Sequence, residues 1–252
     1  MKRLKASLED FGSMIFFAFE TIAWAFRPPF RPGLILTQMA FIGVGSIFIV
    51  GVTGTFTGMV MALQFTYGMK QFAAEGYVGG TVAMAMAREL SPVLTALMVT
   101  GRAGSAMATE LGTMRVTEQM DAMDSMAVNP IQYLVAPRVI ASVVMFPVLT
   151  MVFNVLGFMG AYLMGVYVSR IPAGPFIEHT RTILVPEDVF HGLGKAVLFG
   201  LLVSVVTTWR GYSASGGSRG VGEGTTRRQP RCESSTMSQP RSRCSTSPSA
   251  AL

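Results

Sequence analysis

Charged residues are scarce in this chain of 252 residues. Asp, Glu, Lys and Arg make up 13% of it, about half the fraction usual in soluble domains, while 50% of the residues are apolar. So few charges cannot cover the surface of a soluble globule. The apolar residues also run in long uninterrupted blocks, which indicates that the protein folds in a lipid bilayer.

Cysteine and histidine are almost absent as well. The two cysteines, Cys232 and Cys244, stand near the end of the sequence, and the two histidines are His179 and His191. This distribution excludes a disulfide framework, a Cys-based metal site and thiol redox chemistry from residues 1–231. The sequence also lacks a phosphate-binding loop of the type Gly-x4-Gly-Lys-Ser/Thr, so any ATP must bind to another chain. We therefore expect no catalytic residue, no metal site and no cofactor.

The net charge of +6 is not gathered into one basic patch. Lys and Arg stand at the ends of the apolar blocks, where the cytoplasmic ends of membrane-spanning helices usually carry them. A nucleic-acid site would instead require a basic surface interleaved with exposed aromatic residues. Membrane lipids, and not nucleic acid, are the partners that this pattern favours.

Four apolar blocks predict an all-α polytopic membrane bundle. The expected spans lie within residues 34–67 and at about 76–108, 139–168 and 189–209. If the N-terminus is cytoplasmic, the segments expected inside carry 10 Lys and Arg, and those expected outside carry 3. The positive-inside rule therefore supports a cytoplasmic N-terminus.

The segment before the first span has a different pattern. In residues 4–26 the apolar positions recur at spacings of three and four, which predicts a helix lying in the membrane interface. Prolines 28, 29 and 32 end it. Residues 1–33 are thus expected to form an interfacial segment, the alternative being a short first spanning helix.

Two glycines in the first span, in the motif Gly54-x-x-x-Gly58, predict close packing against another helix. The alternative is that the motif has no special role, because glycine is common in membrane helices.

Arg88 and Glu89 are two adjacent charges at the centre of an otherwise uncharged block, residues 76–101. Charges at that depth cost several kcal/mol and usually have a function. Neighbouring helical residues point about 100° apart, so each charge must meet another helix, a cavity or a ligand. We interpret the pair as a polar spot in a translocation cavity, with Arg88 suited to a lipid phosphate. The alternative is structural ion pairing with a neighbouring helix or subunit.

Two other positions in this span are notable. Pro92, just beyond the two charges, removes a backbone hydrogen bond and predicts a kink of the helix next to them. Arg102, in the motif Gly101-Arg-Ala-Gly104, either extends to the membrane interface or has a function of its own, and the sequence favours neither.

The segment between the second and third spans, residues 110–130, predicts a short amphipathic cytoplasmic helix that ends at Asn129-Pro130. One expected face holds Val116, Met120, Met123 and Ala127, and the other holds Glu118, Asp121 and Ser125. Acidic residues are unusual on the cytoplasmic side. The pattern favours docking into a groove on a soluble partner, and a plain interfacial helix is the alternative.

Several motifs in this order resemble the MlaE (YrbE) permease family of ABC transporters over residues 10 to 227. They are Ala87-Arg-Glu-Leu-Ser-Pro-Val93, Gly101-Arg-Ala-Gly-Ser105, Glu110-Leu-Gly-Thr-Met-Arg-Val-Thr-Glu-Gln-Met-Asp121, Ala127-Val-Asn-Pro130, Ala136-Pro-Arg138, Gly220-Val-Gly222 and Thr225-Thr-Arg227.

The resemblance implies a multi-pass permease of the bacterial inner membrane, with an interfacial N-terminal helix and five spans. It implies a homodimer bound to an ABC ATPase that hydrolyses ATP, a periplasmic lipid-binding protein with an MCE domain, and in some systems a STAS-domain subunit. The substrate implied is phospholipid or a related hydrophobic lipid, moved between inner and outer membranes. Such a permease is not itself an enzyme.

The resemblance also assigns roles to residues. It places Arg88 and Glu89 in the lipid cavity, with Gln64, Phe65 and Phe72 as weaker candidates for its wall. It places residues 110–126 on the coupling helix that contacts the ATPase. The candidate residues there are Glu110, Arg115, Glu118, Gln119 and Asp121.

The family pattern stops after Arg227. The permease segment is expected over 34–227, whereas residues 228–252 are rich in Ser, Arg and Pro and predict a disordered tail where the family has a fifth apolar helix. A reading-frame change near codon 227 and a genuine variant with a polar tail are the two explanations. Two other functions remain open, an ion-coupled secondary transporter and a non-catalytic membrane scaffold.

Overall fold

The described part of the chain is entirely helical. A computed structural model describes residues 2–25 and 32–214, and every regular element within these ranges is a helix. Four helical stretches are long and apolar enough to cross a membrane: Pro32–Lys70, Glu75–Val116, Ile131–Val168 and Pro186–Tyr212. This confirms the prediction of an all-α bundle with four evident spans. The tail predicted over residues 228–252 lies outside the described residues.

Each span contains its predicted apolar block and extends beyond it. The first is α2 (Pro32–Lys70) and the fourth is α9 (Pro186–Tyr212). The second consists of η1 (Glu75–Tyr77), α3 (Val78–Ala85), η2 (Met86–Leu90), α4 (Ser91–Val99), η3 (Thr100–Gly104) and α5 (Ser105–Val116). The third consists of η4 (Ile131–Val135), α7 (Ala136–Tyr162) and η5 (Leu163–Val168). The predicted spans are shorter because hydropathy marks only the part of a helix that needs an apolar solvent.

π-helical turns interrupt the second span at η2 and again at η3. Pro92 follows η2 directly, in the first turn of α4. Proline cannot donate a backbone hydrogen bond, and its ring crowds the carbonyl four residues earlier. Next to Pro92, where the sequence predicts a kink, the structure thus has the π turn η2.

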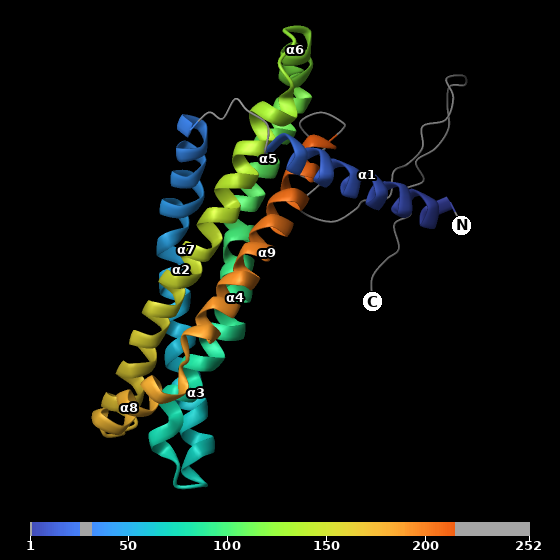
Figure 1. The fold of residues 1–252 in the computed structure, drawn as a ribbon. Coiled ribbons are helices and arrows are strands. Elements are labelled where there is room, and N and C mark those ends of the chain that lie inside the picture. The colour runs from blue at the N-terminus through green and yellow to red at the C-terminus, as the bar shows by residue number, and fades with distance from the viewer. Residues whose placement is uncertain (1, 26–31, 215–252) are drawn as a thin grey trace, which may run out of the picture.

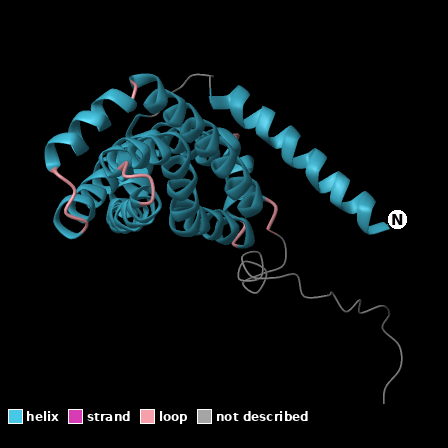
Figure 2. Ribbon diagram, turned by 90° about the horizontal axis from the view of Figure 1, so that it is seen from below, coloured by secondary structure: helices cyan, strands magenta, loops and turns pink. Residues whose placement is uncertain are grey.

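Short helices mark the two ends of the bundle (Figure 1). α6 (Gln119–Ser125) projects from the end that α1 (Lys2–Ala25) crosses, and α8 (Ala173–Ile183) packs on α3 at the opposite end. Figure 2 shows that α1 extends sideways past the spans. Its Phe17 is buried against the start of the third span, and the ring centroid lies 5.3 Å from that of Tyr212. Phe16 and Phe19 are exposed, so α1 has one face on the protein and one apolar face free for lipid.

The first and third spans pack backbone to backbone through glycine. A Cβ atom added to Gly58 would lie 1.8 Å from the carbonyl oxygen of Gly157. One added to Gly160 would lie 2.3 Å from the carbonyl oxygen of Thr55, and one added to Gly54 would lie 3.1 Å from that of Phe153. The structure thus confirms close helix packing at Gly54-x-x-x-Gly58.

Candidate substrate and coupling sites

The two adjacent charges of the second span both pair with α9. Arg88 Nη1 lies 3.5 Å from Asp188 Oδ1, and Glu89 Oε1 accepts a hydrogen bond of 2.6 Å from Lys195 Nζ. Lys195 Nζ also donates to the backbone carbonyl of Arg88, at 3.2 Å. We call Arg88, Glu89, Asp188 and Lys195 the charged cluster. Of the three partners expected for these charges, another helix, a cavity or a ligand, the structure shows another helix, which is the ion pairing that the structural alternative predicts.

Glycine brings α9 close enough for these contacts. Asp188 and Lys195 are seven residues apart, which places them on one face of α9 at a separation of two turns. Between them lies Gly192, where an added Cβ would stand 2.0 Å from the carbonyl oxygen of Ala87. The backbone of α9 therefore lies directly on the π turn η2, which holds both Arg88 and Glu89.

The charged cluster is accessible on one side. The Asp188 side chain is 12% exposed, whereas those of Arg88, Glu89 and Lys195 are 47%, 63% and 38% exposed. Lys195 also lines a hollow of about 580 Å³ with Phe190, His191, Gly194, Leu198 and Glu187. The four side chains balance in charge, yet their cations can still reach a ligand. A cation beside an apolar hollow suits an amphiphile with an anionic head.

Asp188 and Lys195 were not predicted from the sequence. The signal was present, because an acid and a base seven residues apart flank the glycine at the start of the fourth span. Asn154 was also missed; its side-chain oxygen accepts a hydrogen bond from the Ser91 hydroxyl, two residues beyond Glu89.

The weaker cavity candidates lie elsewhere, near the end of the first span and in the turn that follows it. Gln64 is exposed on α2, Phe65 packs partly against the main core, and Phe72 is exposed in the turn after α2. Among the described residues no hydrogen bond or ion pair joins any of them to the charged cluster. The structure brings Arg88 and Glu89 together with α9, and not with these three.

The coupling segment is a separate short helix, not a continuation of the second span. α5 ends at Val116, Glu118 adopts a left-handed backbone (φ 58°), and α6 begins at Gln119. Ala127, just after α6, is also left-handed (φ 60°). The single amphipathic stripe expected from Val116 to Ala127 is therefore wrong, because these two residues turn the chain at either end of α6.

The five candidate coupling residues fall into three settings. Glu110 lies on α5, where its Oε2 is 3.0 Å from Arg138 Nη2. Arg115 donates to Asp121 Oδ1 at 3.0 Å, across the turn between α5 and α6. Glu118 and Gln119 are exposed. Four of the five thus lie at or beside the start of α6, while Glu110 lies further back on the second span.

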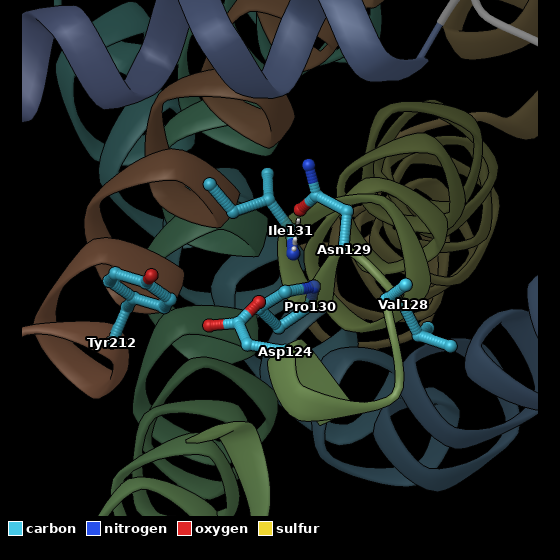
Figure 3. A pocket seen from close by; sticks show the side chains of 7 residues that line it. Asp124, Val128, Asn129, Pro130, Ile131 and Tyr212 are labelled. Atoms are coloured by element: carbon cyan, nitrogen blue, oxygen red, sulfur yellow. Dashed lines mark hydrogen bonds between the residues drawn. The ribbon is translucent and has the colours of Figure 1, made fainter. Parts of the chain in front are cut away.

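α6 is held at its base. Met120 is fully buried, and a hollow of about 300 Å³ lies beside the end of α6 (Figure 3). Its lining residues are Asp124, Ala127, Val128, Asn129, Pro130, Ile131 and Tyr212. The Asn129 side chain accepts a hydrogen bond of 2.9 Å from the Ile131 amide, at the start of the third span. The helix predicted to end at Asn129-Pro130 ends earlier, at Ser125, and Asn129-Pro130 instead directly precede the next helix, which begins at Ile131.

Comparison with known proteins places this architecture among permeases. The family model described as Permease MlaE matches residues 35–228. A probable ABC transporter permease protein of Rickettsia conorii is 40% identical over 225 residues, which cover 89% of this chain and 87% of that protein.

Two relatives carry names that mention lipid or a lipid system. The intermembrane phospholipid transport system permease protein MlaE of Haemophilus influenzae is 38% identical over 195 residues, 77% of this chain and 75% of that protein. The chloroplastic protein TRIGALACTOSYLDIACYLGLYCEROL 1 of Arabidopsis thaliana is 38% identical over 191 residues, 76% of this chain and 55% of that protein.

Proposed function

The chain belongs to the MlaE family of ABC transporter permeases, and on this premise we propose that it moves phospholipid, or a related hydrophobic lipid, between the inner and outer membranes of a bacterium. It is a multi-pass membrane protein and a transport subunit that is not itself catalytic. The proposal extends to this chain the phospholipid named for the Haemophilus relative.

The charged cluster is the observation that carries the proposal. Lys195 lines the hollow of about 580 Å³ that contains Phe190 and Leu198, and Arg88, which pairs with Asp188 of the same helix as Lys195, supplies a second cation to the cluster. A phospholipid has the complementary form, with an anionic phosphate next to acyl chains. Arg88 forms a fork suited to phosphate, while Lys195 supplies a mobile point charge. Glu89 and Asp188 hold these cations in place when no lipid is bound.

The mechanism is mechanical. A separate ABC ATPase binds and hydrolyses the ATP, and it contacts the permease at α6 through Arg115, Glu118, Gln119 and Asp121. Because α6 is joined to the second and third spans, movement of the ATPase on ATP binding shifts α5 and α7. These spans then reshape the cavity that holds the lipid, which is displaced without chemical change.

The remaining assignments complete this proposal. Two copies of the chain form a homodimer, and a periplasmic MCE-domain protein receives or delivers the lipid, with a STAS-domain subunit as an optional member. The N-terminus is cytoplasmic in the inner membrane, residues 1–33 form the interfacial segment and residues 34–227 form the permease domain. Gln64, Phe65 and Phe72 contribute to the outer wall of the cavity. The side that α1 and α6 share in Figure 1 is then the cytoplasmic one.

Reconstituted transport tests the proposal. The full chain is placed in vesicles with its ATPase, and ATP-dependent transfer of a fluorescent phospholipid to an acceptor protein is measured. Arg88→Gln and Lys195→Gln should each lower the transfer rate about tenfold, the value of one charge-assisted hydrogen bond. ATP hydrolysis should continue. The matched control is Arg181→Gln, which removes an exposed arginine on α8.

The alternatives give different results in the same vesicles. An ion-coupled transporter would lose transfer when a protonophore collapses the proton gradient, and would not need ATP. A scaffold would show no transfer at all. Equal rates for the wild type, Arg88→Gln and Lys195→Gln would remove the charged cluster from the lipid path.

A further inference from the structure

Arg102 lies in the second π turn of its span, η3, and its guanidinium rests on α2. Arg102 Nη1 donates hydrogen bonds of 3.2 Å to the Phe41 carbonyl and 3.2 Å to the Ser46 hydroxyl. The guanidinium carbon is 5.7 Å from the centroid of the Phe41 ring. A Cβ added to Gly45 would lie 2.1 Å from Arg102 Nη2, so the missing side chain forms a notch for this group.

The charge of Arg102 is unbalanced within the described part of the chain. Arg88, Arg115 and Arg138 each pair there with a carboxylate, whereas no described carboxylate forms an ion pair with Arg102. Both of its hydrogen bonds use Nη1. The side chain is also exposed, and within the described residues Nη2 and Nε form no hydrogen bond, so both can donate to another molecule. A guanidinium forms its strongest contacts when two nitrogens meet one anion.

The depth of Arg102 follows from the contacts of α9. Gly211 packs on Ala108 and Leu111, and the next residue, Tyr212, stacks with Phe17 of α1. α1 is thus level with residues 108–111, and Arg102 lies about 9–14 Å further into the bundle at about 1.5 Å per residue. With α1 in the interface, the guanidinium lies below the head groups, where an uncompensated charge is costly.

An apolar stripe leads away from this cation along α2. Gly45, Ile49, Val52 and Phe56 follow one another at spacings of four, three and four, so they share one face of the helix. Ile49, Val52 and Phe56 are exposed. The stripe enters a hollow of about 430 Å³ lined by Val52, Thr53, Phe56, Thr57, Val60 and Met61. The Arg102 guanidinium therefore lies at one end of an exposed apolar stripe on α2.

We propose that Arg102, with its guanidinium seated in the Gly45 notch, binds the phosphate of a phospholipid from the leaflet on the α1 side, whose acyl chains lie along Ile49, Val52 and Phe56. This second lipid site rests on the proposed function, because it assumes that the permease handles phospholipid. Arg102 lies 14 residues, or about 21 Å of helix, from Arg88 of the charged cluster. Each of the two arginines stands in a π turn, a feature that recurs at functional positions in helices.

Photocrosslinking of the full chain tests this site without an ATPase. Val52 is replaced by p-benzoylphenylalanine, and the protein is placed in nanodiscs that contain phosphatidylglycerol and diacylglycerol with identical acyl chains. Mass spectrometry gives the ratio of the two lipid adducts. The ratio should favour phosphatidylglycerol, and Arg102→Gln should reduce that preference about tenfold. Arg102→Lys should keep part of it, since a point charge still attracts phosphate.

Controls separate this site from the charged cluster. Arg88→Gln should leave the adduct ratio at Val52 unchanged, so the second site can stand even if transport by the charged cluster is disproved. An equal ratio in the wild type and Arg102→Gln overturns the proposal. So does an adduct between two copies of the chain, which would make the stripe a protein interface, or loss of the preference on adding inorganic phosphate, which would indicate a site for the free anion.

Discussion

Glu110 Oε2 lies 3.0 Å from Arg138 Nη2, and this ion pair joins α5 to α7 on the two sides of the segment that carries α6. Arg138 is only 2% exposed, and its Nη1 has no hydrogen-bond partner among the described residues. Glu110 is therefore the carboxylate that compensates a buried cation. The pair therefore closes the base of the loop that carries α6.

Removing the acid of this pair should destabilise the fold. Glu110→Gln leaves Arg138 buried without its counter-charge, and we expect a loss of about 2 kcal/mol in the free energy of unfolding. Thermal unfolding of the purified protein in detergent measures it. Asp121→Asn is the matched control, because the Arg115–Asp121 pair is exposed and should contribute less than about 1 kcal/mol. Equal effects of the two substitutions would contradict the buried role of Arg138.

The glycine contact between the first and third spans makes a sharper prediction. Gly58→Ala places a methyl group against the backbone of Gly157, which cannot move aside as a side chain can. We expect a loss of about 3 kcal/mol or a failure to fold, as for other overpacked sites. Gly68→Ala, in the same helix with nothing within 4 Å of the added atom, should be neutral or slightly stabilising. Yield and midpoint of thermal unfolding distinguish the two variants.

A second glycine pair tests the charged cluster. Gly192→Ala should push α9 away from Ala87 and lengthen both ion pairs, whereas Gly174→Ala on α8, away from the hollow beside Lys195, adds its methyl group to open space. Lipid transfer in vesicles should fall severalfold for the first variant and remain normal for the second. If Gly192→Ala transports at the wild-type rate, close contact of α9 with η2 is not needed.

Reversing the acidic charges at the start of α6 tests whether an ATPase docks there. The double variant Glu118→Lys, Asp121→Lys should weaken association with the ATPase, because it reverses both acids at the start of α6. The control Glu178→Lys changes an exposed acid on α8 at the other end of the bundle. Co-purification of the ATPase from membranes gives the readout. Undiminished recovery of the ATPase with the double variant would count against docking at α6.

The four spans could be predicted because the bilayer requires long uncharged blocks, which can be recognised in the sequence whichever way the helices pack. The need of Arg88 and Glu89 for partners also followed from the cost of buried charge. Their partners on α9 could not be predicted. Which side chains meet depends on how the helices pack and on the π turns, and neither leaves a periodic signal in the sequence. The break in the helix at Glu118 could not be predicted either, since a left-handed backbone at a residue other than glycine leaves no signal in the sequence.

The π turn η2 also sets the angular phase of everything that follows it in the second span. A single π turn inside an α-helix holds one surplus residue, and each residue of an α-helix advances by about 100°. Straightening η2 into a regular α-helix with all its residues kept would therefore rotate Arg102 by about 100° away from Gly45, whereas deleting one residue from Met86–Leu90 would remove the π turn and keep Arg102 in phase. Both arginines keep their neighbours because the π turn absorbs the surplus residue, so an insertion in α4, between the two arginines, would turn Arg102 away from Gly45, while a deletion inside η2 would not.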